Sequence, residues 1–117
     1  MKRLNLTHLT EIAEQARNEV YIKYDLETPE QIHEGYCTDF AKAMTNKLNI
    51  EGYESTIVVT DNFELMDELK DYETVAADYS SESHCYVMVE DDYDTYYYDA
   101  FDIEGVDDEV NLKYHTL

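Results

Sequence analysis

Basic side chains are scarce in this sequence. The 117 residues include only 8 Lys and Arg against 28 Asp and Glu, which gives a formal net charge of -20 at pH 7. Proteins that bind phosphate backbones use clustered Lys and Arg to release counterions. We therefore expect no direct binding of DNA or RNA, and no attraction to an anionic membrane surface.

Long apolar runs and a secretory leader are also missing. No stretch approaches the roughly 20 apolar residues needed to span a bilayer. The basic start, Met1-Lys2-Arg3, is followed by polar, helix-periodic residues. A signal peptide would instead continue with an apolar segment of about 7 to 15 residues. These absences predict a cytoplasmic protein.

Cysteine occurs only twice, at positions 37 and 85, which excludes a disulfide framework. In a cytosolic chain such a pair is read as free thiols, metal ligands or a nucleophile. Hydrophobic residues make up 44% of the chain and aromatics 13%, enough for a small core and against disorder. With no internal repeat or linker, residues 1–117 are predicted to form a single domain.

Helical signals dominate the first half of the chain. Apolar residues recur at three- and four-residue spacing over 7–23, which predicts an amphipathic helix. Thr28, Pro29 and Gln31 provide a cap, a first-turn proline and a capping-box partner for a short second helix. A third amphipathic helix begins at Cys37 and ends near residue 52, so this cysteine lies at a helix N-terminus.

Strand signals dominate the second half. Residues 55–60 are rich in β-branched side chains, and a capping box predicts a helix over about 62–72. Residues 84–90 alternate two sets of side chains, and 95–101 form a second strand after a polar turn, which predicts an antiparallel hairpin. Residues 73–83 show no clear pattern, and one short strand or helix is expected after a turn near Gly105.

Three residues suggest chemistry. A helix N-terminus lowers the pKa of a thiol through its partial positive charge, as expected for Cys37. A cysteine nucleophile needs a base, usually His, and a third group that orients the imidazole. His84 begins one strand of the hairpin and Asp99 lies on the other. An even-numbered loop would place them on one face, opposed for a loop at 91–92 or diagonal for one at 92–93, whereas an odd loop would separate them.

Three segments resemble the transglutaminase-like branch of papain-fold cysteine enzymes. Gly35-Tyr36-Cys37-Thr38-Asp39-Phe40-Ala41 resembles the nucleophile motif Gly-x-Cys-x-Asp/Glu-Phe/Tyr-Ala. His84-x-Tyr86-Val87-x-Val89 resembles the second motif, and Tyr98-Asp99-Ala100 the third. The resemblance covers about residues 28–106 in the family order Cys, His, Asp. One departure is the absence of tryptophan, because the aromatic after the family's His is often Trp and is Tyr86 here.

The resemblance implies an α+β fold in which N-terminal helices, including the Cys-bearing one, pack on a small antiparallel β-sheet. It also implies acyl transfer through a thioester, as in peptidases, deamidases and transglutaminases, without a cofactor. Cys37 would be the nucleophile, His84 the base and Asp99 the orienting carboxylate. Gln31 would share an oxyanion hole with the backbone N–H of Cys37, although its capping role already explains it.

Other functions stay open. The charge also fits a non-catalytic acidic binding protein, for example a nucleic-acid mimic that inhibits a basic nucleic-acid-binding protein. It fits a plain solvated surface equally well. Salt adaptation is a further explanation of the charge, but the composition disfavours it. A basic protein or peptide is the expected substrate or target, and the oligomeric state is open.

Zinc bound by His33, Cys37, His84 and Cys85 is disfavoured, because Gly35 interrupts the helical spacing and adjacent strand residues face apart. Cys85 is expected in the core, facing away from His84. Asp91, Asp92 and Asp94 are expected to form a solvated turn rather than a calcium site.

Overall fold

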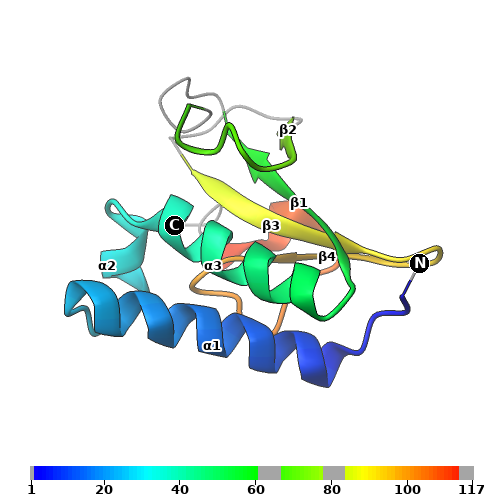
Figure 1. The fold of residues 1–117 in the computed structure, drawn as a ribbon, viewed down its shortest axis with the longest axis horizontal. Helices are drawn as coiled ribbons and strands as arrows, with labels where there is room; N and C mark the ends of the chain where they lie inside the picture. The colour runs from blue at the N-terminus through cyan, green and yellow to red at the C-terminus, as the bar shows by residue number, and fades with distance from the viewer. Residues whose placement is uncertain (1, 61–66, 78–83, 114–117) are drawn as a thin grey trace.

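The computed structural model describes residues 2–60, 67–77 and 84–113. Within these ranges the fold is α+β, with three α-helices and a four-stranded mixed sheet in the order β2-β1-β3-β4 (Figure 1). The elements are α1 (Leu6–Tyr24), α2 (Pro29–His33), α3 (Cys37–Ile50), β1 (Glu54–Val59), β2 (Thr74–Ala76), β3 (Cys85–Glu90), β4 (Thr95–Tyr98) and the 3-10 helix η1 (Glu109–Asn111). No helix among the described residues is both long enough and apolar enough to cross a membrane.

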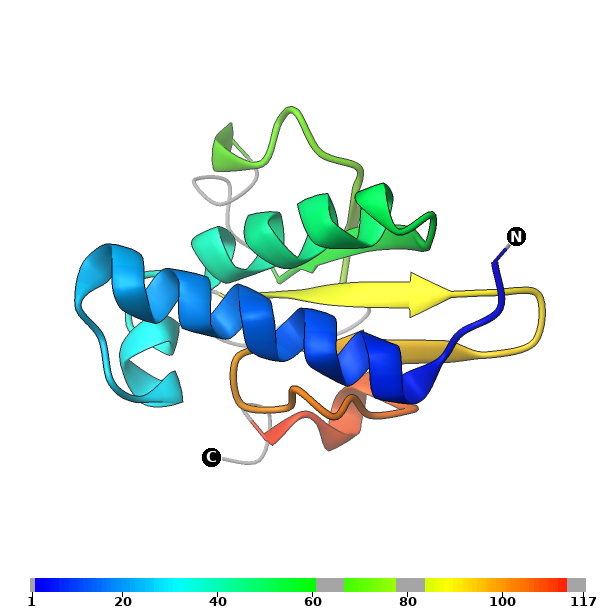
Figure 2. The same ribbon diagram turned by 60° about the horizontal axis from the view of Figure 1, so that its bottom comes forward.

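The long helices α1 and α3 lie side by side over one face of the sheet (Figure 2). The predicted amphipathic pattern of α1 is confirmed, because its buried side chains are the periodic apolar ones: Leu9, Ile12, Ala13, Ala16 and Val20. The helix begins after Asn5, whose side chain accepts a hydrogen bond from the His8 N–H, and it ends at Asp25 in the left-handed conformation.

Helices α2 and α3 begin in different ways. The predicted capping box of α2 is formed: Thr28 Oγ1 accepts from the Gln31 N–H at 3.4 Å, and Gln31 Oε1 accepts from the Thr28 N–H at 3.0 Å. Helix α3 begins at Cys37, as predicted, but its N-cap residue Tyr36 makes no side-chain capping bond. The first backbone amides of α3 therefore have no side-chain acceptor from the cap.

The sheet is mixed, which corrects the expectation of a purely antiparallel one. Strands β1, β3 and β4 pair antiparallel, but β2 runs parallel to β1, with Thr74 opposite Ile57. Because β1 and β2 are parallel, the chain must run back to the level at which β1 begins before it enters β2. A tight hairpin therefore cannot join these two strands. Sequence patterns missed β2 because it has only three residues and none is buried. Of the helix expected over 62–72, residues 67 and 68 are helical and 61–66 lie outside the described residues.

The β3–β4 hairpin has the even-numbered loop that a common face for His84 and Asp99 requires. Glu90 is paired with Thr95, and the Asp91 N–H donates to the Asp94 carbonyl at 3.0 Å. The loop is therefore at 92–93, the diagonal arrangement of the two predictions. The expected strand over 95–101 ends early, at Tyr98, because the chain turns at Asp99.

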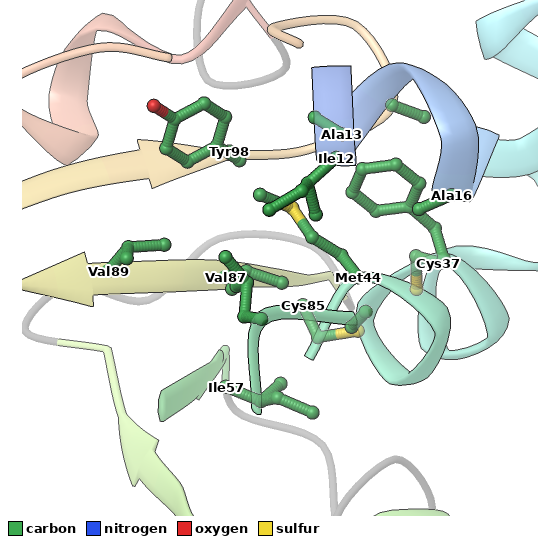
Figure 3. Packing of buried hydrophobic residues seen from close by; sticks show 14 of the residues in the cluster. Ile12, Ala13, Ala16, Cys37, Met44, Ile57, Cys85, Val87, Val89 and Tyr98 are labelled. Carbon is green, nitrogen blue, oxygen red and sulfur yellow. The ribbon is translucent and has the colours of Figure 1, made fainter. Parts of the chain in front are cut away.

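The two faces of β3 are both covered. Cys85, Val87 and Val89 face the main core, toward α1 and α3 (Figure 3), whereas Tyr86 belongs to a smaller cluster with Val58 and Leu112. The smaller cluster is closed by the segment after β4, where Val106 bridges to Tyr97 and η1 follows. The predicted alternation of β3 is confirmed, because its two sets of side chains belong to different clusters.

Candidate active site

Cys37 is the first residue of α3 and lies beyond the start of β3 (Figure 3). Its side chain is buried in the main core cluster with 8% of the residue exposed. The sequence places it there because Phe40, Ala41, Met44 and Leu48 form the buried face of the same helix. Packing of that face against the sheet places the thiol near Cys85, at the start of β3.

His84 immediately precedes β3 and is 1% exposed. Its backbone is held by Thr60, which follows β1: the Thr60 hydroxyl accepts from the His84 N–H at 2.7 Å and donates to the His84 carbonyl at 2.9 Å. The Thr60 N–H donates to the same carbonyl at 2.9 Å. Sequence reasoning did not identify this positioning residue, because a threonine at the end of a strand is also expected from strand propensity alone.

The His84 ring meets a carboxylate inside the protein. Nε2 of His84 lies 3.3 Å from Oδ2 of Asp99, and both residues are 1% exposed. The other oxygen, Oδ1, accepts from the N–H groups of Phe101 at 2.9 Å and Asp102 at 2.8 Å. One oxygen of Asp99 thus makes the turn after β4 and the second orients the imidazole.

Burial and pairing compete in setting the pKa values of this pair. Burial raises the pKa of Asp99, but the hydrogen bond and charge of His84 and the backbone N–H of Asp102 lower it, and the net pKa is below its ordinary value. Burial lowers the pKa of His84, but hydrogen bonds with Asp99 and Cys37 raise it, and the net pKa is above its ordinary value. Both shifts favour an imidazolium between a carboxylate and a thiolate.

The thiol of Cys37 is strongly acidic. A hydrogen bond from the Cys85 thiol lowers its pKa most, burial opposes this, and the hydrogen bond and charge of His84 and the backbone N–H of Cys85 lower the pKa further, to about 5. The hydrogen bond to Cys37 and burial raise the pKa of the Cys85 thiol well above its ordinary value. Cys37 is therefore the thiolate of the pair and Cys85 its protonated donor.

Cys85 is a core residue, 1% exposed, as predicted. Although Cys85 and His84 are adjacent in the sequence and were expected to face apart, both lower the pKa of the same thiol, that of Cys37.

His33, at the end of α2, joins the site through its ring. The ring centroid lies 4.3 Å from that of His84 and 5.1 Å from that of Phe101. These contacts place a further aromatic ring against the imidazole. The sequence singled out His33 only as a possible metal ligand; within the described ranges, no group of three or more His, Cys, Asp or Glu side chains is arranged to hold a metal ion.

Gln31 lies at the first turn of α2 and is exposed. Its side-chain oxygen accepts from the N–H groups of Glu27 at 2.6 Å and Thr28 at 3.0 Å. The capping role is confirmed by these bonds. Its role in an oxyanion hole, shared with the backbone N–H of Cys37, stays a prediction.

Two acidic side chains, Asp39 and Glu68, lie near the thiols. Thr38, next to Cys37, donates its hydroxyl to Glu68 at 2.9 Å, and Asp39 accepts from the Tyr24 hydroxyl at 2.8 Å. The charges of Glu68 and Asp39 also help raise the pKa of Cys85. A cationic group near Cys37 would therefore be favoured electrostatically, and an anionic one opposed.

No protein-family model, curated protein or solved structure matches this chain. The resemblance to transglutaminase-like enzymes therefore stays a prediction carried by three short motifs. The function has to be argued from the geometry of the residues themselves.

Proposed function

We propose that this chain is a small cysteine-dependent acyl-transfer enzyme, of peptidase, deamidase or transglutaminase type, with the transglutaminase-like core that its motifs resemble. The observation that carries the proposal is the buried His84–Asp99 pair, whose imidazole lies close enough to the Cys37 thiol to lower its pKa. A pKa of about 5 for Cys37 supports it, because a thiolate is the reactive form of a cysteine nucleophile.

The proposed mechanism assigns one task to each group. The Cys37 thiolate attacks a carbonyl carbon, and the backbone N–H groups at the start of α3 stabilise the resulting oxyanion. Because Nε2 of His84 faces Asp99, Nδ1 is the nitrogen that delivers a proton to the leaving group. A thioester on Cys37 remains, and water or an amine, deprotonated by the same nitrogen, attacks it and releases the thiolate.

A basic protein or peptide is the proposed substrate. The net charge of -20 and the carboxylates of Asp39 and Glu68 near the two thiols support this class. Such a field concentrates cationic partners at the surface, with an effect that falls as salt increases. Substrates with Lys or Arg beside the acyl group are therefore expected to react faster than neutral or acidic ones.

An acyl-trapping experiment tests the proposal without knowledge of the natural substrate. The protein is mixed with p-nitrophenyl acetate, and intact-mass and peptide mass spectrometry follow acetylation while absorbance follows the released phenolate. We expect acetylation of Cys37 as a hydroxylamine-sensitive thioester, and none at this position in Cys37→Ser. The His84→Gln variant, which is similar in size and neutral, should form and hydrolyse the thioester at least about 100-fold more slowly, since general acid–base catalysis supplies about 10²–10⁴.

If other side chains of the wild-type protein were acetylated and Cys37 were not, the proposal would be overturned. A Cys37 thioester whose formation and hydrolysis are unchanged by His84→Gln would overturn it too, because a positioned base would then contribute nothing. The Cys85→Ser variant serves as a matched control for loss of a core thiol. It should still form the thioester.

A second candidate is a non-catalytic acidic binding protein, of the kind that mimics nucleic acid. The low exposure of the triad favours it, since Cys37 is 8% exposed and His84 only 1%, which restricts access of a large substrate. In this case the carboxylates would contact a basic nucleic-acid-binding protein where phosphates otherwise lie.

Retention on an immobilised basic nucleic-acid-binding protein, measured over a range of NaCl concentrations, tests the binding candidate. Charge-led binding should weaken steeply between about 0.1 and 1 M salt, where the Debye length falls from about 10 to 3 Å. The Cys37→Ser variant should bind as wild type does. No retention at low salt, or retention that salt does not weaken, would argue against it.

A further inference from the structure

The two cysteines of this protein form a pair inside one core cluster, although they are 48 positions apart. Both are free thiols, and each lies close enough to shift the pKa of the other. Figure 3 shows the two side chains in the same part of the core, where β3 starts. Acyl transfer through the triad needs one cysteine as nucleophile, so in the proposed mechanism Cys85 forms no bond to the substrate and only lowers the pKa of Cys37.

The two thiols differ in access to solvent and in protonation. Cys37 is 8% exposed at the start of a helix, whereas Cys85 is 1% exposed on the inner face of β3. The pKa of Cys37 is lowered and that of Cys85 is raised, so one is a thiolate and the other a thiol at neutral pH. This is the arrangement expected of a reactive cysteine with a resolving partner, because oxidants attack the accessible thiolate first.

We propose that Cys37 and Cys85 are a redox modification site, at which a hydroperoxide converts the two thiols to a reversible intramolecular disulfide. The proposal rests on the shared position of the two side chains in the core at the start of β3 and on their unequal burial, and it does not depend on acyl-transfer activity. If Cys37 is also the nucleophile, the disulfide switches that activity off.

The reaction balances with a hydroperoxide as the oxidant. The Cys37 thiolate attacks one peroxide oxygen, the O–O bond breaks, and the leaving hydroxide or alkoxide takes a proton, which leaves a sulfenic acid on Cys37. The Cys85 sulfur then attacks the Cys37 sulfur, the S–O bond breaks, and the Cys85 proton leaves with the hydroxide as water. Reduction by a dithiol returns both thiols through thiol–disulfide exchange.

Formation of the bond requires a small local movement. A disulfide has an S–S bond of about 2 Å and Cβ atoms roughly 3.8 Å apart, so the sulfurs must move closer than in a hydrogen bond. Cys37 lies at the N-terminal end of α3, where the N-cap residue Tyr36 makes no side-chain capping bond. Adjustment at a helix terminus disturbs fewer backbone hydrogen bonds than adjustment in a helix centre.

Peptide mass spectrometry tests the proposal directly. The protein is treated with a small excess of hydrogen peroxide at neutral pH, the remaining thiols are blocked with iodoacetamide, and the protein is digested with trypsin. Cleavage after lysine places Cys37 in peptide 24–42 and Cys85 in peptide 71–113, so the disulfide joins two separate peptides. We expect this cross-linked species in the monomer, with loss of both free thiols and their return after dithiothreitol.

Two matched variants separate the roles of the thiols. In Cys85→Ser, a sulfenic acid should form on Cys37 and be trapped by dimedone, with no disulfide within the chain. In Cys37→Ser, Cys85 should remain reduced at the peroxide concentration that oxidises wild type. Wild-type protein whose Cys37 is alkylated beforehand provides the same control without a substitution, and oxidation of Met88 in peptide 71–113 reports excessive peroxide.

Several results would overturn the redox site. They are failure to detect the joined peptides in wild type, disulfides found only between chains, or equal oxidation of Cys85 with Cys37 alkylated. The peroxide experiment contains no acyl donor, so its result does not depend on whether the protein catalyses acyl transfer. A disulfide with no acyl transfer would keep the redox site alone, and acyl transfer with no disulfide would keep the enzyme alone.

Discussion

Asp91 and Asp99 lie at opposite ends of the β3–β4 hairpin and use the same local bonds. Oδ1 of Asp91 accepts from the N–H groups of Tyr93 and Asp94, as Oδ1 of Asp99 accepts from two amides after β4. In both residues Oδ2 has a further partner, the Leu4 N–H for Asp91 at 2.9 Å and the His84 ring for Asp99 at 3.3 Å. Hydrogen bonds lower the pKa of both carboxyl groups.

Asp91 and Asp99 differ in burial and in the group that Oδ2 contacts. Asp91 is partly exposed and closes a surface turn onto the N-terminal segment, whereas Asp99 is 1% exposed and faces an imidazole. A turn-forming aspartate is common and by itself indicates no function. Asp99 is a candidate site residue because packing removes it from water and leaves one oxygen for His84.

The largest expected difference concerns acyl transfer. Asp99→Asn keeps an oxygen for the turn but loses the charge that supports the imidazolium, so acetyl transfer should slow by roughly 10²–10⁴-fold. Asp91→Asn should leave the rate within about twofold of wild type, because it makes the same change far from the thiol. Single-turnover kinetics with p-nitrophenyl acetate measure both. Equal rates in the two variants would remove Asp99 from the mechanism.

The next difference concerns stability. Asp99→Ala removes one partner of a buried pair and should lower the free energy of unfolding by about 3–5 kcal/mol. Asp91→Ala should cost clearly less, because water replaces the lost bonds at the surface. Urea unfolding at pH 6 compares them. A larger loss for Asp91→Ala would mean that the surface turn matters more to the fold than the buried pair.

The pH dependence of stability follows from the direction of each pKa shift. The folded pKa of Asp99 is lowered, so its contribution is complete above the unfolded value of about 3.9 and is lost as pH falls through the folded pKa. The folded pKa of His84 is raised, so its contribution is complete below about 6.5 and is lost as pH rises through the folded pKa. The difference between wild type and Asp99→Asn in urea unfolding should therefore be greatest between about pH 4 and 6.5.

A smaller effect concerns the titration of the nucleophile. The rate of Cys37 alkylation by iodoacetamide should rise with a midpoint near pH 5 in wild type. The midpoint should move toward the ordinary thiol value of about 8.5 in Cys85→Ala, which removes the neighbour that lowers the Cys37 pKa most, and should not move in Asp91→Asn. The midpoint is the diagnostic quantity, since a lower pKa also lowers intrinsic nucleophilicity, with a Brønsted slope of about 0.4–0.5. An unchanged midpoint in Cys85→Ala would contradict the assigned thiol contact.

The smallest effect is expected at Gln31. Gln31→Ala removes the reciprocal half of the capping box and should lower the free energy of unfolding by about 0.5–1 kcal/mol. The acetylation rate should stay within about twofold of wild type if its side-chain oxygen serves only the cap. Thermal or urea unfolding and the acetylation assay measure the two outcomes. A tenfold loss of rate with unchanged stability would instead support the oxyanion role.

Much of the fold was predictable because its signals are local. The apolar periodicity of α1, the Thr28–Gln31 capping box and the alternation in β3 depend on neighbouring residues. The hairpin of residues 84–90 and 95–101 was also predictable, but its loop parity was left open until the pairing of Glu90 with Thr95 showed an even loop. The parallel strand β2 was not predictable, because its three residues show no alternation and its pairing is set by a distant partner.

The sequence by itself determined that Cys37 begins a helix and that His84 and Asp99 belong to one hairpin, whereas the register of that hairpin, which places them on one face, came from the structure. Only the tertiary structure decided which of two similar aspartates is buried, that Cys85 donates to Cys37, and that Thr60 holds the His84 backbone. The physical reason is that helices and turns arise from interactions within a few residues, whereas burial and the resulting pKa shifts depend on segments that packing brings together.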